Sequence, residues 1–335
     1  MKPSLMHILA LTVFANLCAG LVIISIVVRL PEHGHSKDKP ETVAPDATSK
    51  FIDVRYFIQE AIKPVLSLAA SEMLQLKAQS TVLFENPKGD VWGKEVVPVT
   101  YEASKGRYDE NRKIFSLSGA VQMKRENGWL SSQEADYNID EQLFHASGDV
   151  RTKNSPPGGD EILINSDKAF SLFLKNVSEY EGNVNGSIRK NNSSGKEVNF
   201  TCEKLQSDQT TSILIATGNV SLEKQDMTAT GLRGEVRFDP KTKTLKDYLL
   251  YDDVKLTQKV NPARGRAYTR KAFAEKFEGH PLENKFILTG APRVLEGLDV
   301  VRGSRIIVRQ NDETMEVEDS VSNIGFKENG SKNGE

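Results

Sequence analysis

The stretch SILIATGNVSLEKQ, from Ser212 to Gln225, alternates apolar and polar side chains, as a β-strand with one buried face does. Gly218 lies in the middle of its apolar side, which otherwise holds Leu214, Ala216, Val220 and Leu222. A glycine inside a strand weakens it and usually marks a bulge, a bend or the close approach of another backbone. The fold therefore depends on whether this glycine recurs.

Five other segments repeat the arrangement. They are IFSLSGAVQMK, LFHASGDVRTK, SEYEGNVNGSI, YLLYDDVKLTQ and FILTGAPRVLE, and the successive spacings are 29, 34, 36, 34 and 38 residues. The predicted bend glycines are Gly119, Gly148, Gly182, Gly218 and Gly290, with Asp252 at the equivalent place in the fifth copy. Segments rich in Asp, Asn and Pro, such as YDENRK and DPKTKT, separate the copies and are typical of hairpin turns.

A recurring period of this length predicts a repeat architecture. Each repeat is too short for two strands and a full crossover helix, and no helical periodicity lies between the strands. We therefore predict an all-β, antiparallel array of stacked hairpins. Each sheet is expected to fold over along the line of glycines, so that the apolar faces close on one another like a V.

The residues in register with the bend positions are predicted to face inward. They are Phe115, Leu117, Val121, Met123, Phe144, Val150, Tyr180, Val184, Ile188, Leu214, Val220, Leu222, Leu250, Val254, Leu256, Phe286, Leu288 and Val294. The opposite register is mostly polar, for example Ser118, Asp149 and Asn219, although Ile213 and Ile215 break the pattern. Periodicity alone does not distinguish an apolar groove from the filled core of a closed sandwich.

The N-terminal segment from Ile8 to Val28 is a run of 21 mostly apolar residues. As a helix it would span about 30 Å, the thickness of a bilayer's hydrocarbon core. A cleaved signal peptide has a shorter apolar region, of about 7–15 residues. We therefore predict an uncleaved, single-pass membrane anchor. Lys2 on one side and Arg29, Lys37 and Lys39 on the other leave the orientation undecided by charge.

The composition is that of a soluble body behind this segment, with 38% hydrophobic and 27% charged residues and a net charge of -2. No basic face indicates nucleic-acid binding. The sequence has no nucleophile elbow, metal-spaced Cys/His cluster, paired-carboxylate motif or phosphate loop. We therefore predict a protein that is not an enzyme and has no catalytic residues, bound metal or cofactor.

Longer motifs carry a family resemblance. PVLSLAASEM, TVLFENPKGDVW and the run VTYEASKGRYDENRKIFSLSGAVQMKRENGWLSSQEADYNIDEQLFHASGDV resemble LptC, the membrane-anchored component of the bacterial lipopolysaccharide export machine. DEILINSDKAFSLFLKNVSEYEGNVNGSIRK resembles the opening of the LptA/OstA family, and FILTGAPRVLEGLDVVRGSRIIVRQNDETMEVED resembles its end. The expected organisation is a cytoplasmic end and anchor (1–30), a linker (31–50), an LptC-like domain (51–155), an LptA/OstA-like domain (156–325) and a polar tail (326–335).

The resemblance implies twisted β-jellyrolls whose apolar groove holds the acyl chains of lipopolysaccharide, and the inward residues above would line it. It implies an inner-membrane protein, mostly periplasmic, that receives lipopolysaccharide from an ABC transporter with permease and ATPase subunits. The chain would pass the lipid to further LptA-like domains or to an outer-membrane acceptor. The strand TMEVEDS near the C-terminus is a charged but uninterrupted edge, on which we expect such a partner to dock; the alternative is that the polar tail folds back and covers it. A membrane-anchored structural or adhesive β-repeat protein without lipid cargo is the alternative.

The joint between the two family-like halves has the sequence RTKNSPPGGDEI, residues 151–162. Its consecutive prolines and glycines favour a turn over a long flexible tether. We therefore expect this segment to carry the chain directly from one sheet into the next.

Overall fold

The computed structural model describes residues 47–60, 63–76, 80–92, 98–172, 177–190, 197–261, 267–309 and 314–323. The predicted membrane segment, residues 31–46 of the linker and the polar tail lie outside these ranges. Within them, no helix is long and apolar enough to cross a membrane. The regular elements that the structure describes are β-strands paired in antiparallel fashion, which confirms the predicted fold class.

The chain divides into two compact units. The first comprises residues 1–126 and 131–146, and the second residues 127–130 and 147–335. β8 (Gly128–Asn138) and β9 (Leu143–Asn154) therefore contribute residues to both. The predicted boundary at residues 155/156, which separates family resemblances, stays a prediction.

The first unit contains strands bent into two parts. Its strands are β1 (Ala47–Glu60), β2 (Lys63–Leu76), β3 (Thr81–Glu85), β4 (Lys88–Val91), β5 (Val99–Glu102), β6 (Lys105–Asp109), β7 (Ile114–Arg125) and most of β8. β2 pairs with β3 along one part and with β4 along the other, so β3 and β4 act as one strand interrupted by a corner. β5 and β6 are related in the same way through their pairing with β7.

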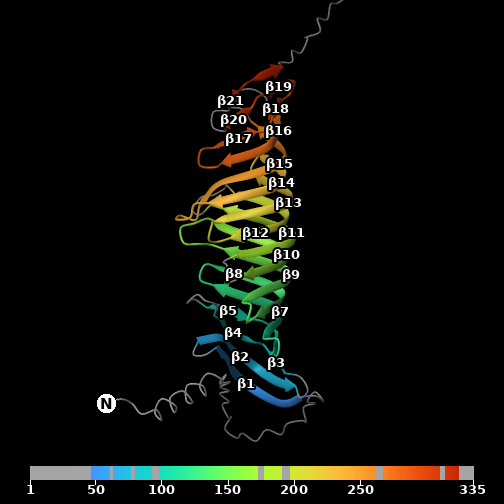
Figure 1. Ribbon diagram of the computed structural model, residues 1–335, viewed down its shortest axis with the longest axis vertical. Helices are drawn as coiled ribbons and strands as arrows, with labels where there is room; N and C mark the ends of the chain where they lie inside the picture. The colour runs from blue at the N-terminus through green and yellow to red at the C-terminus, as the bar shows by residue number, and fades with distance from the viewer. Residues whose placement is uncertain are drawn as a thin grey trace, which may run out of the picture. The chain divides into compact units, whose positions relative to one another are not determined.

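The second unit is a ladder of long antiparallel strands (Figure 1). It contains most of β9 and then β10 (Glu161–Leu172), β11 (Val177–Arg189), β12 (Glu197–Asp208), β13 (Ile213–Lys224), β14 (Met227–Phe238), β15 (Leu245–Val260) and β16 (Tyr268–His280). It ends with β17 (Lys285–Thr289), β18 (Arg293–Glu296), β19 (Asp299–Arg302), β20 (Arg305–Arg309), β21 (Met315–Glu318) and β22 (Val321–Asn323). From β10 to β16 each strand pairs with the next.

Each predicted bend position begins a pair of residues in the left-handed backbone region. The pairs, with φ between 46° and 79°, are Gly119/Ala120, Gly148/Asp149, Gly182/Asn183, Gly218/Asn219, Asp252/Asp253 and Gly290/Ala291. Between β13 and β14 the register jumps from Thr217↔Arg233 to Val220↔Gly231, so two residues of β13 oppose one residue of β14. The bend is therefore a β-bulge, which kinks the strand. Left-handed pairs therefore occur at all six predicted bend positions, including the copy that uses aspartate.

Close contact with the preceding strand explains the glycines. A methyl group added at Gly218 would lie 2.4 Å from Oε2 of Glu203, and one at Gly182 would lie 2.4 Å from Oδ2 of Asp167. The asparagine after each of these glycines donates from Nδ2 to the same carboxylate, at 2.7 Å for Asn219 and 2.9 Å for Asn183. An acidic side chain thus covers the glycine and is held there by its neighbour.

The contact at Gly290 predicts a large effect of a single methyl group. Gly290→Ala should lower the free energy of unfolding by about 1–2 kcal/mol for its left-handed backbone and by about 1–3 kcal/mol more for overpacking. The overpacking arises because the new methyl would lie 2.4 Å from Cβ of Glu275, an atom that no rotamer change removes. Urea unfolding measures the difference.

Gly297→Ala is the matched control, because Gly297 also has a positive φ of 64° but no heavy atom within 4 Å of the added methyl. It should show the backbone cost alone. Equal losses in the two variants would contradict the close-contact explanation.

Candidate functional site: the apolar interior of the second unit

The inward side chains of the second unit form one apolar cluster. We call the two parts of each strand, on either side of its bend, its arms, and both arms contribute to this interior cluster. On β13, Leu214 comes from one arm and Leu222 from the other. Both side chains line the same small cavity of the interior. The bends therefore bring two apolar faces together, as the V arrangement requires.

The residues that the sequence predicts to face inward are buried or half-buried in the structure. In the second unit the interior cluster contains Val184, Ile188, Leu214, Val220, Leu222, Leu250, Val254, Leu256, Phe286, Leu288 and Val294, with Tyr180 half-buried against it. Val150 is also buried in the second unit, and Phe115, Leu117, Val121, Met123 and Phe144 are buried in the first. Their role in binding lipid, and the continuity of one channel through both units, stay predictions.

The interior of the second unit is tightly packed between β12 and β15. A cavity between the arms there measures about 10 Å³ and is lined by residues that include Phe200, Leu214 and Leu222. That is about the space needed for one water molecule. The sequence left open whether the inward residues line a groove or fill a core, and here they fill it. An acyl chain could enter only if the arms moved apart.

Strands without a predicted bend position supply further inward residues, which the alternating register of the bend-bearing strands does not identify. They include Phe200, Leu205, Ala229, Val236, Phe277, Ile306 and Val308. The alternation in VNFTC was the available signal, because Val198, Phe200 and Cys202 occupy every second position there. These strands lack the bend glycine that marks the others.

A much larger cleft lies elsewhere, in the first unit. It measures about 1300 Å³, and its lining includes Lys50, Ile52, Arg55, Lys88 and Glu102. None of the predicted groove residues lines it. The cleft mixes charged and apolar side chains and is distinct from the apolar interior.

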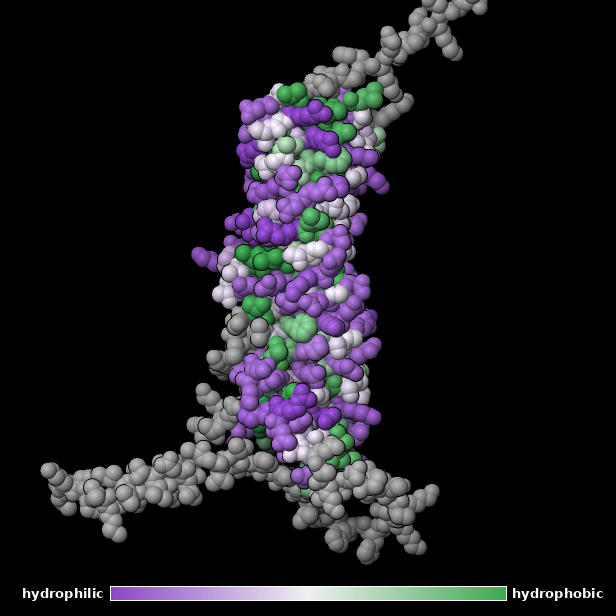
Figure 2. Space-filling model, turned by 45° about the vertical axis from the view of Figure 1, so that its right-hand side comes forward, coloured by the Kyte–Doolittle hydropathy of each residue, from purple (hydrophilic) through white to green (hydrophobic). Residues whose placement is uncertain are grey.

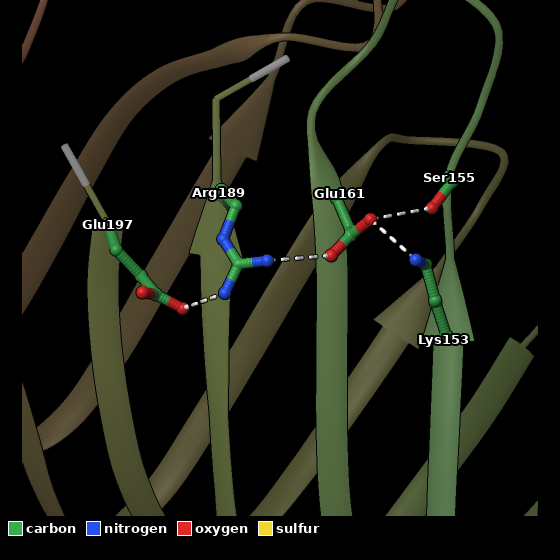
Figure 3. Close-up of polar contacts among 5 residues, drawn as sticks. All are labelled: Lys153, Ser155, Glu161, Arg189 and Glu197. Atoms are coloured by element: carbon green, nitrogen blue, oxygen red, sulfur yellow. Dashed lines mark hydrogen bonds and ion pairs between the residues drawn. The ribbon is translucent and has the colours of Figure 1, made fainter. Parts of the chain in front are cut away.

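Charged side chains tie the strand ends of the second unit together (Figure 3). Glu161 accepts a hydrogen bond from Ser155 at 3.3 Å and forms ion pairs with Lys153 at 2.7 Å and Arg189 at 3.4 Å. Arg189 continues the row to Glu197 at 3.3 Å. The hydrogen bond from Lys153 is the main cause of the lowered pKa of Glu161. The row links β9, β10, β11 and β12 at one rim, where exposure keeps each pair weak.

A buried, paired arginine side chain lies at another part of the inner face of the second unit. Arg270 is only 3% exposed and contacts Glu296 and, at 3.2 Å, Gln258, which flank it on the neighbouring strands. Burial of a charge costs free energy unless the charge is paired and hydrogen-bonded, and both conditions are met here. Within the described ranges, no group of three or more His, Cys, Asp or Glu residues is placed to hold a metal ion.

Cys202 is the free thiol of the interior cluster. Burial raises its pKa to about 11, and the carboxylate of Glu203 adds to the shift. An unfolded chain releases the thiol proton at a lower pH, near about 8.5. The stabilising contribution of the neutral thiol is therefore fully present below the unfolded pKa and is lost as the pH rises toward the folded pKa.

This shift predicts a pH-dependent difference between the natural chain and Cys202→Ala. The cost of the substitution, measured as the loss in unfolding free energy in urea, should be constant below about pH 8.5 and should shrink as the pH approaches about 11. The comparison cancels the titration of the other groups, which both chains share. A cost that stays constant across this range would show that the thiol is solvated in the folded chain.

The outer surface contrasts with the interior. Figure 2 shows hydrophilic side chains over most of the face in view, with separate hydrophobic patches among them. Exposed apolar side chains on the second unit include Ile215 at 37%, which breaks the polar register as the sequence indicates, and Leu232 at 55%. Tyr251 on the same outer face stacks under Arg233, whose guanidinium carbon lies 4.4 Å from the ring centroid.

Residues 199–314 match the family described as LptA/(LptD N-terminal domain) LPS transport protein. This segment runs from β12 to the residue before β21 and contains most of the strands that build the interior cluster. No curated protein matches the chain. Among solved structures, the chain is similar to LptH of Pseudomonas aeruginosa, the LptA-homologous periplasmic component of its lipopolysaccharide transport device. The identity is 13%, the match covers 36% of this chain and 80% of that one, and the TM-score is 0.32.

Proposed function

We propose that this chain is a non-enzymatic carrier that holds the acyl chains of lipopolysaccharide between the arms of its bent strands. The observation that carries the proposal is the coincidence of the family match, residues 199–314, with the strands that enclose the interior cluster. Burial of acyl chains there would contribute about 0.8 kcal/mol per CH₂ group. The headgroup would remain in water, and no covalent chemistry is required.

We further propose that the chain is anchored in the inner membrane by residues 8–28, with its bulk in the periplasm. In this arrangement the LptC-like half receives lipid from an ABC transporter and the LptA-like half passes it toward the outer membrane. The apolar run and the sequence motifs support this arrangement. Within the described residues, β1 is paired along one edge with β2, and β21 along one edge with β20. Free edges of this kind can accept a strand from a partner domain.

A structural spacer without cargo is the second candidate. The filled interior favours it, because a cavity of about 10 Å³ has no room for an acyl chain. The two candidates differ in one property, namely whether the arms of the second unit separate around a lipid.

Photo-crosslinking from the interior distinguishes these candidates. Phe277 is fully buried in the interior cluster, and replacing it with a photoreactive phenylalanine analogue places the probe between the arms. A carrier incubated with lipopolysaccharide should give a crosslinked lipid adduct from this position, because the acyl chains would lie beside the probe. Mass spectrometry of the adduct identifies the lipid.

Phe273 provides the matched control on the same strand, β16. Its ring lies under the guanidinium of Arg293, at 4.5 Å, and pairs across the sheet with Lys255, on the face opposite to Phe277. The same analogue at Phe273 should give little adduct. Equal capture at both positions, or none at Phe277 in a folded chain, would contradict the carrier proposal and leave the spacer.

A further inference from the structure

The joint between the family-like halves is a tight turn in the second unit. Gly159 donates its backbone N–H to the carbonyl of Pro156 at 3.0 Å, and Gly158 adopts a left-handed φ of 72°. This agrees with the expectation of a turn from the Pro-Pro-Gly-Gly sequence. The turn does more than connect β9 with β10, because its last residues contact a distant part of the same unit.

The 155–160 turn and the start of β15, which it contacts, lie on opposite rims of the second unit, that is, along the two rows of turns that join its strands. Consecutive strands are antiparallel, so the turns before β10, β12 and β14 lie along one rim, and the turns before β11, β13 and β15 lie along the other. In strands folded at mid-length, the two rims are the free ends of the two arms. A bond from the 155–160 turn to the start of β15 therefore joins one arm to the other across the mouth of the fold.

Asp160 makes that bond. Its Oδ2 accepts the backbone N–H of Leu245 at 2.7 Å, and its own N–H donates to the carbonyl of Lys243 at 3.0 Å. Asp160 is only 3% exposed. A carboxylate that accepts a backbone N–H forms a charge-assisted bond stronger than a neutral one. The two residues are far apart in sequence, so the bond serves tertiary structure and not the local turn.

The residue next to Asp160, Gly159, also packs closely against the turn before β15, which contains Lys243. A methyl group added at Gly159 would lie 2.7 Å from Cβ of Lys243 and 2.9 Å from its carbonyl oxygen. Lys243 is itself fixed, because its Nζ donates to the hydroxyl of Ser212 at 3.1 Å on the neighbouring turn. The base of the 155–160 turn is held by the row of charges in Figure 3, where Ser155 and Glu161 lie on either side of it.

We infer that residues 155–160 and 239–245 form a clasp that holds the two arms of the second unit together, and that its release admits lipid to the interior. The role in admitting lipid rests on the proposed function, whereas the closure of the arms does not. The filled interior and the bond across the mouth are two parts of one closed state. An acyl chain can enter from the side only if the interior side chains separate and the bond between Asp160 and Leu245 breaks.

Cys202 can report opening without any lipid, because its thiol is buried in the interior cluster and separation of the arms would expose it to a reagent. The test uses the full chain in detergent with Cys18→Ser, so that one thiol remains. In Asp160→Ala, the reaction of Cys202 with a small maleimide at fixed pH should be about tenfold faster, since a buried N–H loses its charged acceptor.

Two variants keep the test specific. Asp160→Asn retains a side-chain oxygen that can accept from Leu245, so its reaction rate should stay nearer to that of the natural chain. Asp208→Ala removes a carboxylate that accepts from Thr210 and Thr211 within the turn before β13, which lies outside the clasp and does not join the rims. It should leave the rate unchanged. Urea unfolding of each variant fixes conditions in which all of them remain folded.

A second experiment adds lipopolysaccharide to the same variants, each carrying the photoreactive analogue at Phe277, and measures how fast the lipid is captured. Faster capture in Asp160→Ala, together with faster thiol labelling, supports the clasp as the entry point. Faster labelling with no capture in any chain overturns the carrier function but keeps the clasp. Faster labelling with unchanged capture overturns its role in entry. Unchanged labelling in folded Asp160→Ala overturns the clasp itself.

Discussion

The fold of this chain depends on the bends of its strands, and at Gly119, Gly182, Gly218 and Gly290 these bends are under one steric constraint, a close contact with the segment before them. Two consecutive residues take the left-handed conformation, and the space beside the first is occupied by a side chain such as Glu203 or Glu275. Glycine meets both demands because it lacks a Cβ. Asp252 shows that the backbone demand alone can be met by another residue, since aspartate tolerates this region better than most.

The bends allow the two arms to bury each other's apolar faces, which neither arm could do alone. A single antiparallel sheet of this kind would leave its apolar face in water. Folding every strand at the same level lets that face cover itself, so side chains such as Leu250 and Phe277 become fully buried without a second layer of helices or a separate sheet. The same geometry leaves β1 and β21 with one unpaired edge each among the described residues, and it leaves two rims at the mouth of the second unit. These are the places where such a fold can open or bind.

Closure of the second unit combines nonpolar and polar contacts of different strength. The interior cluster supplies the larger area, whereas Asp160 supplies a directed bond between the arms. The exposed ion pairs at the rim, such as Arg189 with Glu197, align the strand ends and are individually weak. A lipid that separated the arms would replace the apolar contacts with its own acyl chains. The buried bond has no such substitute, which makes the clasp the specific element of closure.

The sequence by itself determined the strand pattern, the bend positions and which side chains face inward, because alternation and the glycine signal are local. Phe115 and Phe286 could be assigned in this way. The partner strands without glycine, such as the one with Phe200, followed the same alternation but lacked the marker. Only the tertiary structure decided that the arms close until about 10 Å³ remains, and that Asp160 meets Leu245. Both depend on the distance between arms, which the twist and angle of the whole ladder set and no local pattern encodes.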